Sequence, residues 1–288
     1  MILGYRNIII IGLFLMLFLS SGCAGQKAGS VEVQSLPRPL VQDKFLLAGS
    51  GSNIPVTAKL AEGYHAKTGI KVDVPGSIGS EGAINAVQLG QLELGLTSRH
   101  LTPQERALGL QELPYARVAV VFGVHGDVLD KGISTADLIE ILKGSKTTWS
   151  NGAKMYVFVR EEKDSSNLVL YEKIPGFKDV LFESYASHRW GILYSDGAMS
   201  DTLGKTKNSF GVVNTTDIAT ANSIKALDFN GVSPTPQNVL SGDYPLVKEL
   251  SFVYKEKLSS RSQDFLDFVF SLEGRQILLK WGAIPLGR

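Results

Sequence analysis

The residues from Phe45 to Tyr64 predict a strand, a tight turn and a helix in immediate succession. Phe45 to Ala48 is a short apolar run typical of a buried strand, and residues 49–53, Gly-Ser-Gly-Ser-Asn, supply the turn. A strand that turns directly into a helix leaves backbone N–H groups free at the helix start. These donors, the serine hydroxyls and the positive end of the helix dipole suit a bound anion. A serine cap after a tight turn is the structural alternative, and this stretch alone leaves both interpretations open.

Strand and helix patterns alternate along the rest of the chain, which favours an α/β fold with mainly parallel sheets. From about Lys44 to Arg288 the chain is long enough for two modest domains. Strands are predicted at 71–74, 92–97, 116–124, 156–159, 210–213, 225–228 and 250–254. Helices are predicted at 81–89, 134–143, 166–173, 179–187 and 196–203, after a capping box at 102–105, and in two apolar segments near the C-terminus.

The first residues predict export and attachment to a membrane. Arg6 precedes an apolar run from Ile8 to Leu19, which is too short to span a bilayer as a helix, and small residues then lead to Cys23. This pattern resembles a bacterial lipoprotein signal, so we expect a signal peptide at 1–22, lipidation of Cys23 and a flexible tether at 23–42. An ordinary cleaved signal with an incidental cysteine is the alternative.

The composition and motifs disfavour nucleic-acid binding, metal binding and catalysis. The formal net charge is +1, and removal of the signal brings it to about zero, so no broad basic surface is expected. The four histidines lack metal-ligand spacing, and no Gly-x-Ser-x-Gly elbow occurs. Ile54 stands where a dinucleotide fingerprint needs its third glycine, and Met199 stands where a P-loop needs its first. We therefore expect no cofactor, no metal and no enzyme activity.

Two further polar turns precede predicted helices. One spans residues 76–82, Gly-Ser-Ile-Gly-Ser-Glu-Gly, and the other spans 160–167, Arg-Glu-Glu-Lys-Asp-Ser-Ser-Asn. Together with the first turn they predict a site where helix N-termini from two domains converge on one oxyanion. Charge-assisted hydrogen bonds of about 1.5–3 kcal/mol each would allow one arginine and neutral donors to hold it.

From Phe45 to the C-terminus the chain resembles the periplasmic phosphate-binding proteins of ABC transporters. The segments that carry the resemblance are Gly49 to Pro55, Gly79 to Ile84, Leu94 to Arg99, Val159-Arg160 with Ser165 to Asn167, Phe210 to Val213, Pro234 to Val239 and Ser241 to Leu246. The resemblance implies a two-domain clamshell, similar to type II binding proteins, with two crossover strands. It also implies that ligand binds in the cleft and is delivered to a membrane permease.

Carried over position by position, the resemblance implies a set of ligand-binding residues. They are Ser52, Asn53 and Ile54 in the first turn, Ser80 in the second, and Arg160, Ser165, Ser166 and Asn167 in the third. The spacing from the arginine to the first serine is one residue longer than in the family. Ser166 and Asn167 replace its glycine and threonine.

A further departure concerns selectivity. Arg99 stands where the best-known members have an aspartate that accepts a proton from phosphate. Protonated phosphate donates a hydrogen bond and sulfate cannot, so that carboxylate favours phosphate. Here the acceptor would have to be Glu81 or Asp164, or selectivity is weak. Arg99 is expected either inside the cleft, as a second cation, or outside it in an ion pair with an acid such as Glu105.

These observations predict an exported, monomeric lipoprotein that binds phosphate or a similar oxyanion for an ABC importer. A sensory domain that signals to a partner, and a phosphate-ester hydrolase, are the alternatives. If the crossovers are the strands at 118–124 and 250–254, domain I comprises 43–124 plus 245–288, and domain II comprises 125–244.

Overall fold

The computed structural model describes residues 45–255 and 257–288. The predicted signal peptide, Cys23 and the tether at 23–42 lie outside the described residues, as do the first two residues of predicted domain I. Among the described residues, no helix is both long and apolar enough to cross a membrane.

The described residues alternate between strands and helices, in agreement with the predicted α/β pattern. The strands are β1 (Phe45–Leu46), β2 (Ala48–Gly49), β3 (Val72–Asp73), β4 (Gly95–Thr97), β5 (Gln111–His125), β6 (Gly132–Ile133), β7 (Tyr156–Arg160), β8 (Gly191–Leu193), β9 (Ser209–Asn214), β10 (Ile224–Ala226), β11 (Asp228–Phe229), β12 (Val247–Tyr254) and β13 (Ile284–Pro285). The helices are α1 (Ile54–Thr68), α2 (Gly79–Gln88), α3 (Pro103–Ala107), α4 (Thr135–Lys143), α5 (Ser165–Lys173), α6 (Phe177–Ala186), α7 (Asp196–Lys205), α8 (Thr215–Thr220), α9 (Pro236–Ser241), α10 (Ser260–Phe270) and α11 (Leu272–Lys280).

Helix α1 shows how local sequence sets these boundaries. Pro55 suits the first turn, where a missing N–H costs nothing. The helix ends at Gly69, whose φ of 75° is left-handed and whose N–H donates to the carbonyl of His65. Its buried face contains Val56, Leu60, Ala61 and Tyr64, which are the residues that the sequence pattern places there.

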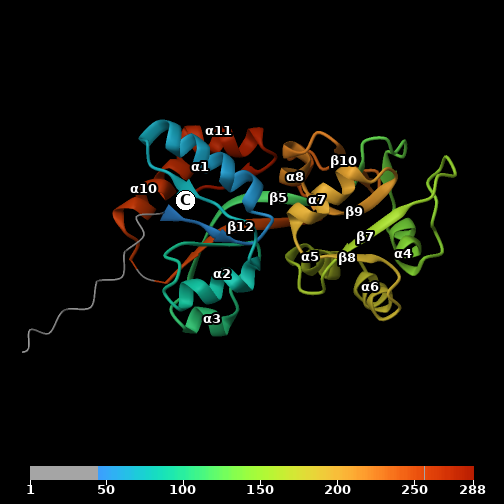
Figure 1. Cartoon of the computed structure of the whole chain (residues 1–288), viewed down its shortest axis with the longest axis horizontal. Coiled ribbons are helices and arrows are strands. Elements are labelled where there is room, and N and C mark those ends of the chain that lie inside the picture. Colours follow the sequence, from blue (N-terminus) through green and yellow to red (C-terminus); the bar gives the residue numbers. More distant parts are fainter. Residues whose placement is uncertain (1–44, 256) are drawn as a thin grey trace, which may run out of the picture. The chain divides into compact units, whose positions relative to one another are not determined.

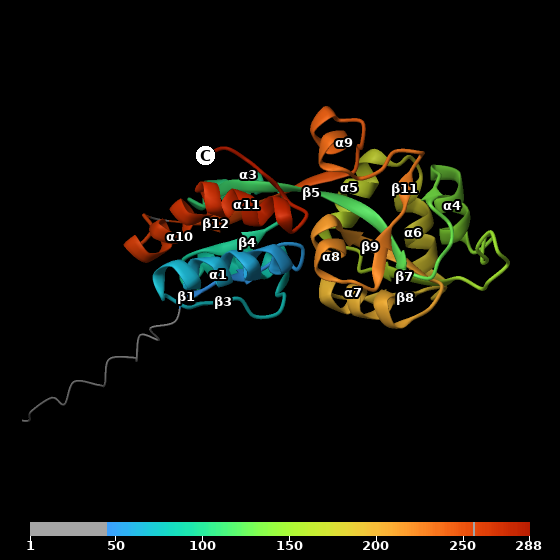
Figure 2. The same cartoon turned by 90° about the horizontal axis from the view of Figure 1, so that it is seen from above.

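Two long strands, β5 and β12, organise the main sheet. Its order is β2-β4-β12-β5-β9-β7-β8, and β10 and β13 also pair with β5. The first part of β5, Gln111 to Ala119, pairs with β12, and the next residues, Val120 to Val124, pair with β9. In Figures 1 and 2, β5 accordingly runs from the helices α1, α10 and α11 into the group that contains α4 to α8.

The expectation of a mainly parallel sheet is wrong. β2 with β4, and β7 with both β8 and β9, are parallel, but β12 with β4, β5 with β12 and β5 with β9 are antiparallel. The cause is that the two crossover strands run against the parallel strands on either side of them.

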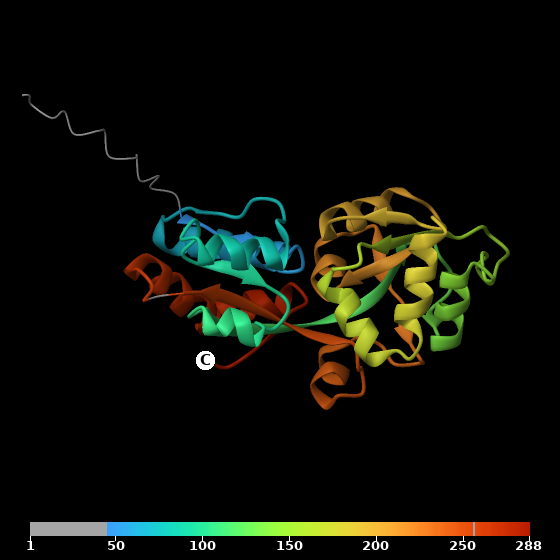
Figure 3. The ribbon, with the colours of Figure 1, turned by 90° about the horizontal axis from the view of Figure 1, so that it is seen from below.

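The buried apolar side chains form separate clusters along these strands. Two clusters draw on residues 45–118 and 250–283, and a third draws on residues 119–247 together with Ile284. We call the elements around the first two clusters the first lobe and those around the third the second lobe. Figure 3 shows β5 and β12 passing from one lobe to the other.

Candidate functional site

The site lies where the carboxyl ends of parallel strands in the two lobes meet. In the first lobe, β2 and β4 end next to each other, which places Ser50, Gly51 and Ser52 near Ser98. In the second lobe, β7 ends at Arg160, β8 ends shortly before Asp196, and β9 ends at Asn214. Ligands of α/β sheets gather at such ends, so this edge is the natural candidate for a binding site.

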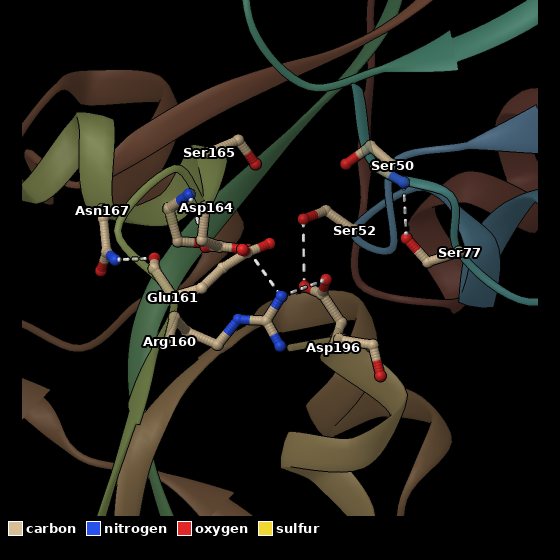
Figure 4. Close-up of polar contacts among 12 residues, drawn as sticks. Ser50, Ser52, Ser77, Arg160, Glu161, Asp164, Ser165, Asn167 and Asp196 are labelled. Carbon is tan, nitrogen blue, oxygen red and sulfur yellow. Dashed lines mark hydrogen bonds and ion pairs between the residues drawn. The ribbon is translucent and has the colours of Figure 1, made fainter. Parts of the chain in front are cut away.

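Arg160 ends β7 and is almost completely buried, with 4% of its surface exposed. Its Nη2 donates to Asp164 Oδ2 at 2.6 Å and to Asp196 Oδ2 at 3.2 Å (Figure 4). Nε and Nη1 have no hydrogen-bond partner among the described residues. Because a buried donor without an acceptor is costly, these two nitrogens call for an acceptor that the described residues do not supply.

The carboxylates of Asp164 and Asp196 differ in the other hydrogen bonds that they accept. Asp164 caps α5 by accepting from the N–H of Ser166 at 2.9 Å. Burial alone would raise the pKa of the Asp164 carboxyl, but the charges of Arg160 and Lys248 hold it below its usual value. Asp196, in the first turn of α7, accepts from Ser52 Oγ at 3.1 Å and from Asn214 Nδ2 at 2.9 Å. Ser52 belongs to the first lobe, so Asp196 connects the lobes.

A third acid, Asp217, shares the side-chain amide of Asn214 with Asp196. Asp217 is 2% exposed, and its Oδ2 accepts from the backbone N–H of Asn214 at 2.8 Å and from Asn214 Nδ2 at 3.1 Å. Burial, followed by the charge of Asp196, raises the pKa of Asp217 to about 7. Asp217 therefore keeps its proton to a higher pH than an ordinary aspartate.

Serine hydroxyls form a chain across the site. Ser50 Oγ lies 2.6 Å from Ser98 Oγ, which lies 2.7 Å from Ser165 Oγ at the start of α5. Lys248 Nζ, on β12, donates to Ser165 Oγ at 3.1 Å and to Ser52 Oγ at 2.7 Å. Hydroxyls from both lobes thus meet one buried ammonium group.

A cavity of about 610 Å³ opens above these groups. Its polar lining includes Ser50, Ser80, Arg160, Ser165 and Asp196, with Glu81 among the lining carboxylates. Its apolar lining consists of Ile78, Leu168, Tyr171, Phe182 and Tyr194. The cavity therefore combines hydroxyl and guanidinium donors with carboxylate acceptors.

Apart from Arg99, the resemblance implies eight residues for ligand binding, and five of them lie in or directly beneath this cavity. Ser80, Arg160 and Ser165 line it, whereas Ser52 and Ser166 lie beneath it in contact with Lys248. Ser80 Oγ accepts from the backbone N–H of Ser98 at 3.2 Å.

The other three implied residues, Asn53, Ile54 and Asn167, neither line the cavity nor contact Lys248. Asn53 is fully buried, donates to the carbonyl of Thr97 and accepts from the hydroxyl of Tyr115. The N–H groups of Asn53 and Ile54 donate to the carbonyls of Ser50 and Gly51, so these two donors of the first turn are already used. Asn167 donates to the carbonyl of Glu161 at 2.7 Å.

Arg99 lines the cavity, but its charged group is paired. Its Nη1 and Nη2 donate to Glu105 at 2.9 and 2.7 Å, and Nη1 also donates to the carbonyl of His100. The guanidinium holds the pKa of the Glu105 carboxyl at about 2. Arg99 therefore shares a feature with each expected environment, because it lines the cavity and its guanidinium is paired with Glu105.

The sequence analysis missed Lys248, Asp196 and Asn214. The position of Lys248 could have been recognised from the sequence. It lies two residues from both Leu246 and Leu250, and alternate residues of a strand point to the same side, which here is buried. Asp196 and Asn214 had no such signal beyond their places near the ends of β8 and β9. Among the described residues, no cluster of histidine, cysteine, aspartate and glutamate is arranged to hold a metal ion.

Comparison with known proteins gives consistent matches. A family model described as a PBP superfamily domain matches residues 37–273. The phosphate-binding protein PstS of Borreliella burgdorferi is 24% identical over 259 residues, which cover 83% of this chain and 89% of that protein. The phosphate-binding protein PstS 2 of Streptococcus pneumoniae is 32% identical over 84 residues, and this chain spans only 28% of its length.

One solved structure extends the comparison to three dimensions. It comes from Clostridium perfringens, contains bound phosphate and is described as a substrate-binding protein of a phosphate ABC transporter. The TM-score between that structure and this one is 0.72, with 25% sequence identity. The match covers 84% of this chain and 99% of that one. The predicted resemblance and the predicted α/β fold with two crossover strands are confirmed.

Proposed function

Because this chain belongs to the PBP superfamily, we propose that it captures phosphate or a related tetrahedral oxyanion between its two lobes and delivers it to an ABC importer. The relatives named as phosphate-binding proteins, and the phosphate-bound structure from Clostridium perfringens, support this choice of ligand. We propose a binding role without catalysis.

The observation that carries the proposal is that Arg160 has buried hydrogen-bond donors without acceptors among the described residues. Its guanidinium is buried on the cavity wall, and two of its nitrogens lack acceptors among the described residues. An oxyanion presents acceptors only, or nearly so, and would satisfy both nitrogens. The serine hydroxyls that line the cavity would add further donors.

Carboxylates in the same cavity support phosphate over sulfate. Asp164 and Asp196 balance the charges of Arg160 and Lys248, so the site offers hydrogen bonds rather than an excess of positive charge. Protonated phosphate can donate to a carboxylate, whereas sulfate leaves that carboxylate facing an anion. We therefore propose that Asp196 or Asp164 replaces the acceptor that the family has at the position of Arg99.

The division into domain I at 43–124 plus 245–288 and domain II at 125–244 remains our proposal. The separation of the buried clusters supports it, although the clusters change on β5 between Val118 and Ala119, a few residues earlier than the proposed boundary. Two crossover strands form a natural hinge, so we propose that ligand closes the cleft by hinge motion.

Export, lipid attachment through Cys23 and a monomeric state are also proposed. The signal pattern at 1–22 supports the first two. A lipid anchor followed by a tether would keep the body at the membrane that holds the permease.

Calorimetry on protein freed of phosphate tests the function. Phosphate, sulfate, molybdate and tungstate are titrated in turn, and we expect phosphate to bind with a 1:1 stoichiometry. Arg160→Ala should weaken binding by about 2–5 kcal/mol, the range for removing one partner of a buried charge pair. Arg117→Ala is the matched control, because Arg117 forms an exposed ion pair with Glu249. Absence of binding by all four anions would refute the proposal.

A further inference from the structure

Lys248 occupies an unusual position for a lysine. It lies on crossover strand β12 and is 5% exposed. Its Nζ donates to Ser52 Oγ at 2.7 Å, to Ser166 Oγ at 2.8 Å and to Ser165 Oγ at 3.1 Å. Ser52 belongs to the first lobe, whereas Ser165 and Ser166 begin α5 in the second. One ammonium group therefore joins the two sides of the site.

These three contacts use the whole hydrogen-bonding capacity of the ammonium group, which has three donors and no acceptor. None of the ion pairs among the described residues includes Lys248. Arg160, by contrast, meets both Asp164 and Asp196, and Arg99 meets Glu105. Lys248 thus contributes a charge that hydroxyl groups solvate and that no carboxylate contacts directly.

The direction of these hydrogen bonds has a consequence for the serines. A hydroxyl oxygen that accepts from an ammonium group must direct its own hydrogen elsewhere. Ser52 directs its hydrogen to Asp196 Oδ1. Ser165 must direct its hydrogen to Ser98 or into the cavity that it lines. A positive charge behind each oxygen also makes the hydroxyl a stronger donor.

The serine chain is left with a surplus donor. Ser50, Ser98 and Ser165 have three hydroxyl hydrogens, and their two mutual contacts use two of them. Lys248 offers no acceptor for the third. Ser50 and Ser165 both line the cavity, so the surplus hydrogen is suited to an acceptor bound there.

We propose that Lys248 is a positioning residue of the anion site, which aims the hydroxyl of Ser165 at the ligand and fixes the first turn against the start of α5. This inference rests on the proposed oxyanion binding. Lys248 does not line the cavity, so it acts on the anion through Ser165, which does, while its contacts with Ser52 and Ser166 hold the first turn and the start of α5 in place.

The test begins with Lys248→Met in the full chain, titrated with phosphate by calorimetry. Methionine keeps the length of the lysine side chain but has no ammonium group, so the substitution removes the three hydrogen bonds to serine. We expect phosphate binding to weaken about 30-fold or more, which is within the range for losing a hydrogen bond that involves a charged group. Lys225→Met is the control, because the ammonium group of Lys225 donates to the carbonyl of Val128 away from the cavity. It should leave phosphate affinity unchanged.

A double-mutant cycle with Ser166→Ala separates positioning from general support of the fold. If Lys248 acts through the hydroxyls, Ser166→Ala weakens binding in the wild type but has little further effect in Lys248→Met. Additive effects would overturn the proposal. Should Lys248→Met fail to fold, Ser166→Ala alone provides the test, because Ser166 does not line the cavity. Unchanged phosphate affinity in that variant would also overturn it.

The outcomes distinguish this inference from the proposed function. Wild-type protein that binds none of the four anions refutes the function and this inference with it. Wild-type protein that binds phosphate, together with a Lys248→Met variant that binds it equally tightly, refutes only the role of Lys248.

Discussion

Gly51 faces the carboxylate of Asp196 so closely that a methyl group on its α-carbon would come within 2.2 Å of Asp196 Oδ2. Gly51 lies in the turn after β2 in the first lobe, and Asp196 begins α7 in the second. Only a residue without a side chain permits this approach. The second glycine of the Gly-Ser-Gly-Ser turn therefore allows the contact between lobes on which the site depends.

Gly51→Ala should weaken phosphate binding by about 1–3 kcal/mol, the usual cost of overpacking a close contact, because Asp196 must move away from Ser52 and Arg160. Calorimetry measures the loss. Gly197→Ala is the matched control, since Gly197 follows Asp196 on α7 and has open space around its α-carbon. Equal affinities for the two variants would show that the approach of Gly51 to Asp196 does not matter for binding.

Asp196→Asn should reduce discrimination between phosphate and sulfate. Removing the negative charge favours both anions, but it also removes an acceptor for the phosphate proton. We therefore expect the ratio of the sulfate to the phosphate dissociation constant to fall about tenfold or more. Asp164→Asn, measured alongside, decides between the two carboxylates, since the fall should follow whichever one accepts from phosphate. If the ratio of dissociation constants is unchanged in both variants, Glu81 becomes the candidate acceptor for the phosphate proton.

The parts of the site that could be predicted lie in turns. Arg160 and Ser165 follow a strand and precede a helix, and a polar loop at that place indicates the carboxyl edge of a sheet. The strand, turn and helix at 45–64 were recognisable for the same reason, because apolar periodicity changes from strand to helix within a few residues.

The remaining site residues depend on long-range pairing that local patterns do not encode. Lys248 reaches Ser52 and Ser165 only because β12 lies between β4 and β5. The antiparallel direction of the two crossovers has the same origin, so alternation of strands and helices alone suggested a parallel sheet. Asn53 was a reasonable ligand position, but its side-chain oxygen accepts a hydrogen bond from the hydroxyl of Tyr115 on β5.

Arg99→Gln tests whether Arg99 serves the fold rather than selectivity. Its guanidinium is held by Glu105, so we expect the phosphate-to-sulfate preference to stay within about twofold of the wild type. The stability effect should depend on pH. Because the pKa of Glu105 is held at about 2, below its unfolded value of about 4.3, the pair stabilises the protein above pH 4.3 and loses this contribution as pH falls towards 2.

Urea unfolding of the wild type and Arg99→Gln at several pH values measures this difference. The gap in the free energy of unfolding should be widest above about pH 4.5 and should close towards pH 2. A constant gap would show that Arg99 does not lower the pKa of Glu105, whereas a large change in anion preference would favour a role for Arg99 inside the cleft.

Asp217 should make the protein less stable as pH rises towards neutrality. Burial and the charge of Asp196 raise its pKa to about 7, whereas Asn214 and Lys248 act in the opposite direction without overcoming them. Between about pH 4 and pH 7 the folded protein therefore holds a proton that the unfolded chain has released, so the free energy of unfolding falls across this range and then levels off.

Asp217→Asn should remove that slope. Both hydrogen bonds from Asn214 fall on Oδ2 of Asp217, and an amide oxygen in that place can still accept them. Denaturant unfolding of both proteins from pH 4 to pH 8 isolates the contribution of this one group, because the other titrating residues are common to both. The wild type should lose stability relative to the variant as pH rises through this window. Parallel curves would mean that Asp217 is ionised throughout, with Lys248 and the Asn214 donors sufficient to hold its charge.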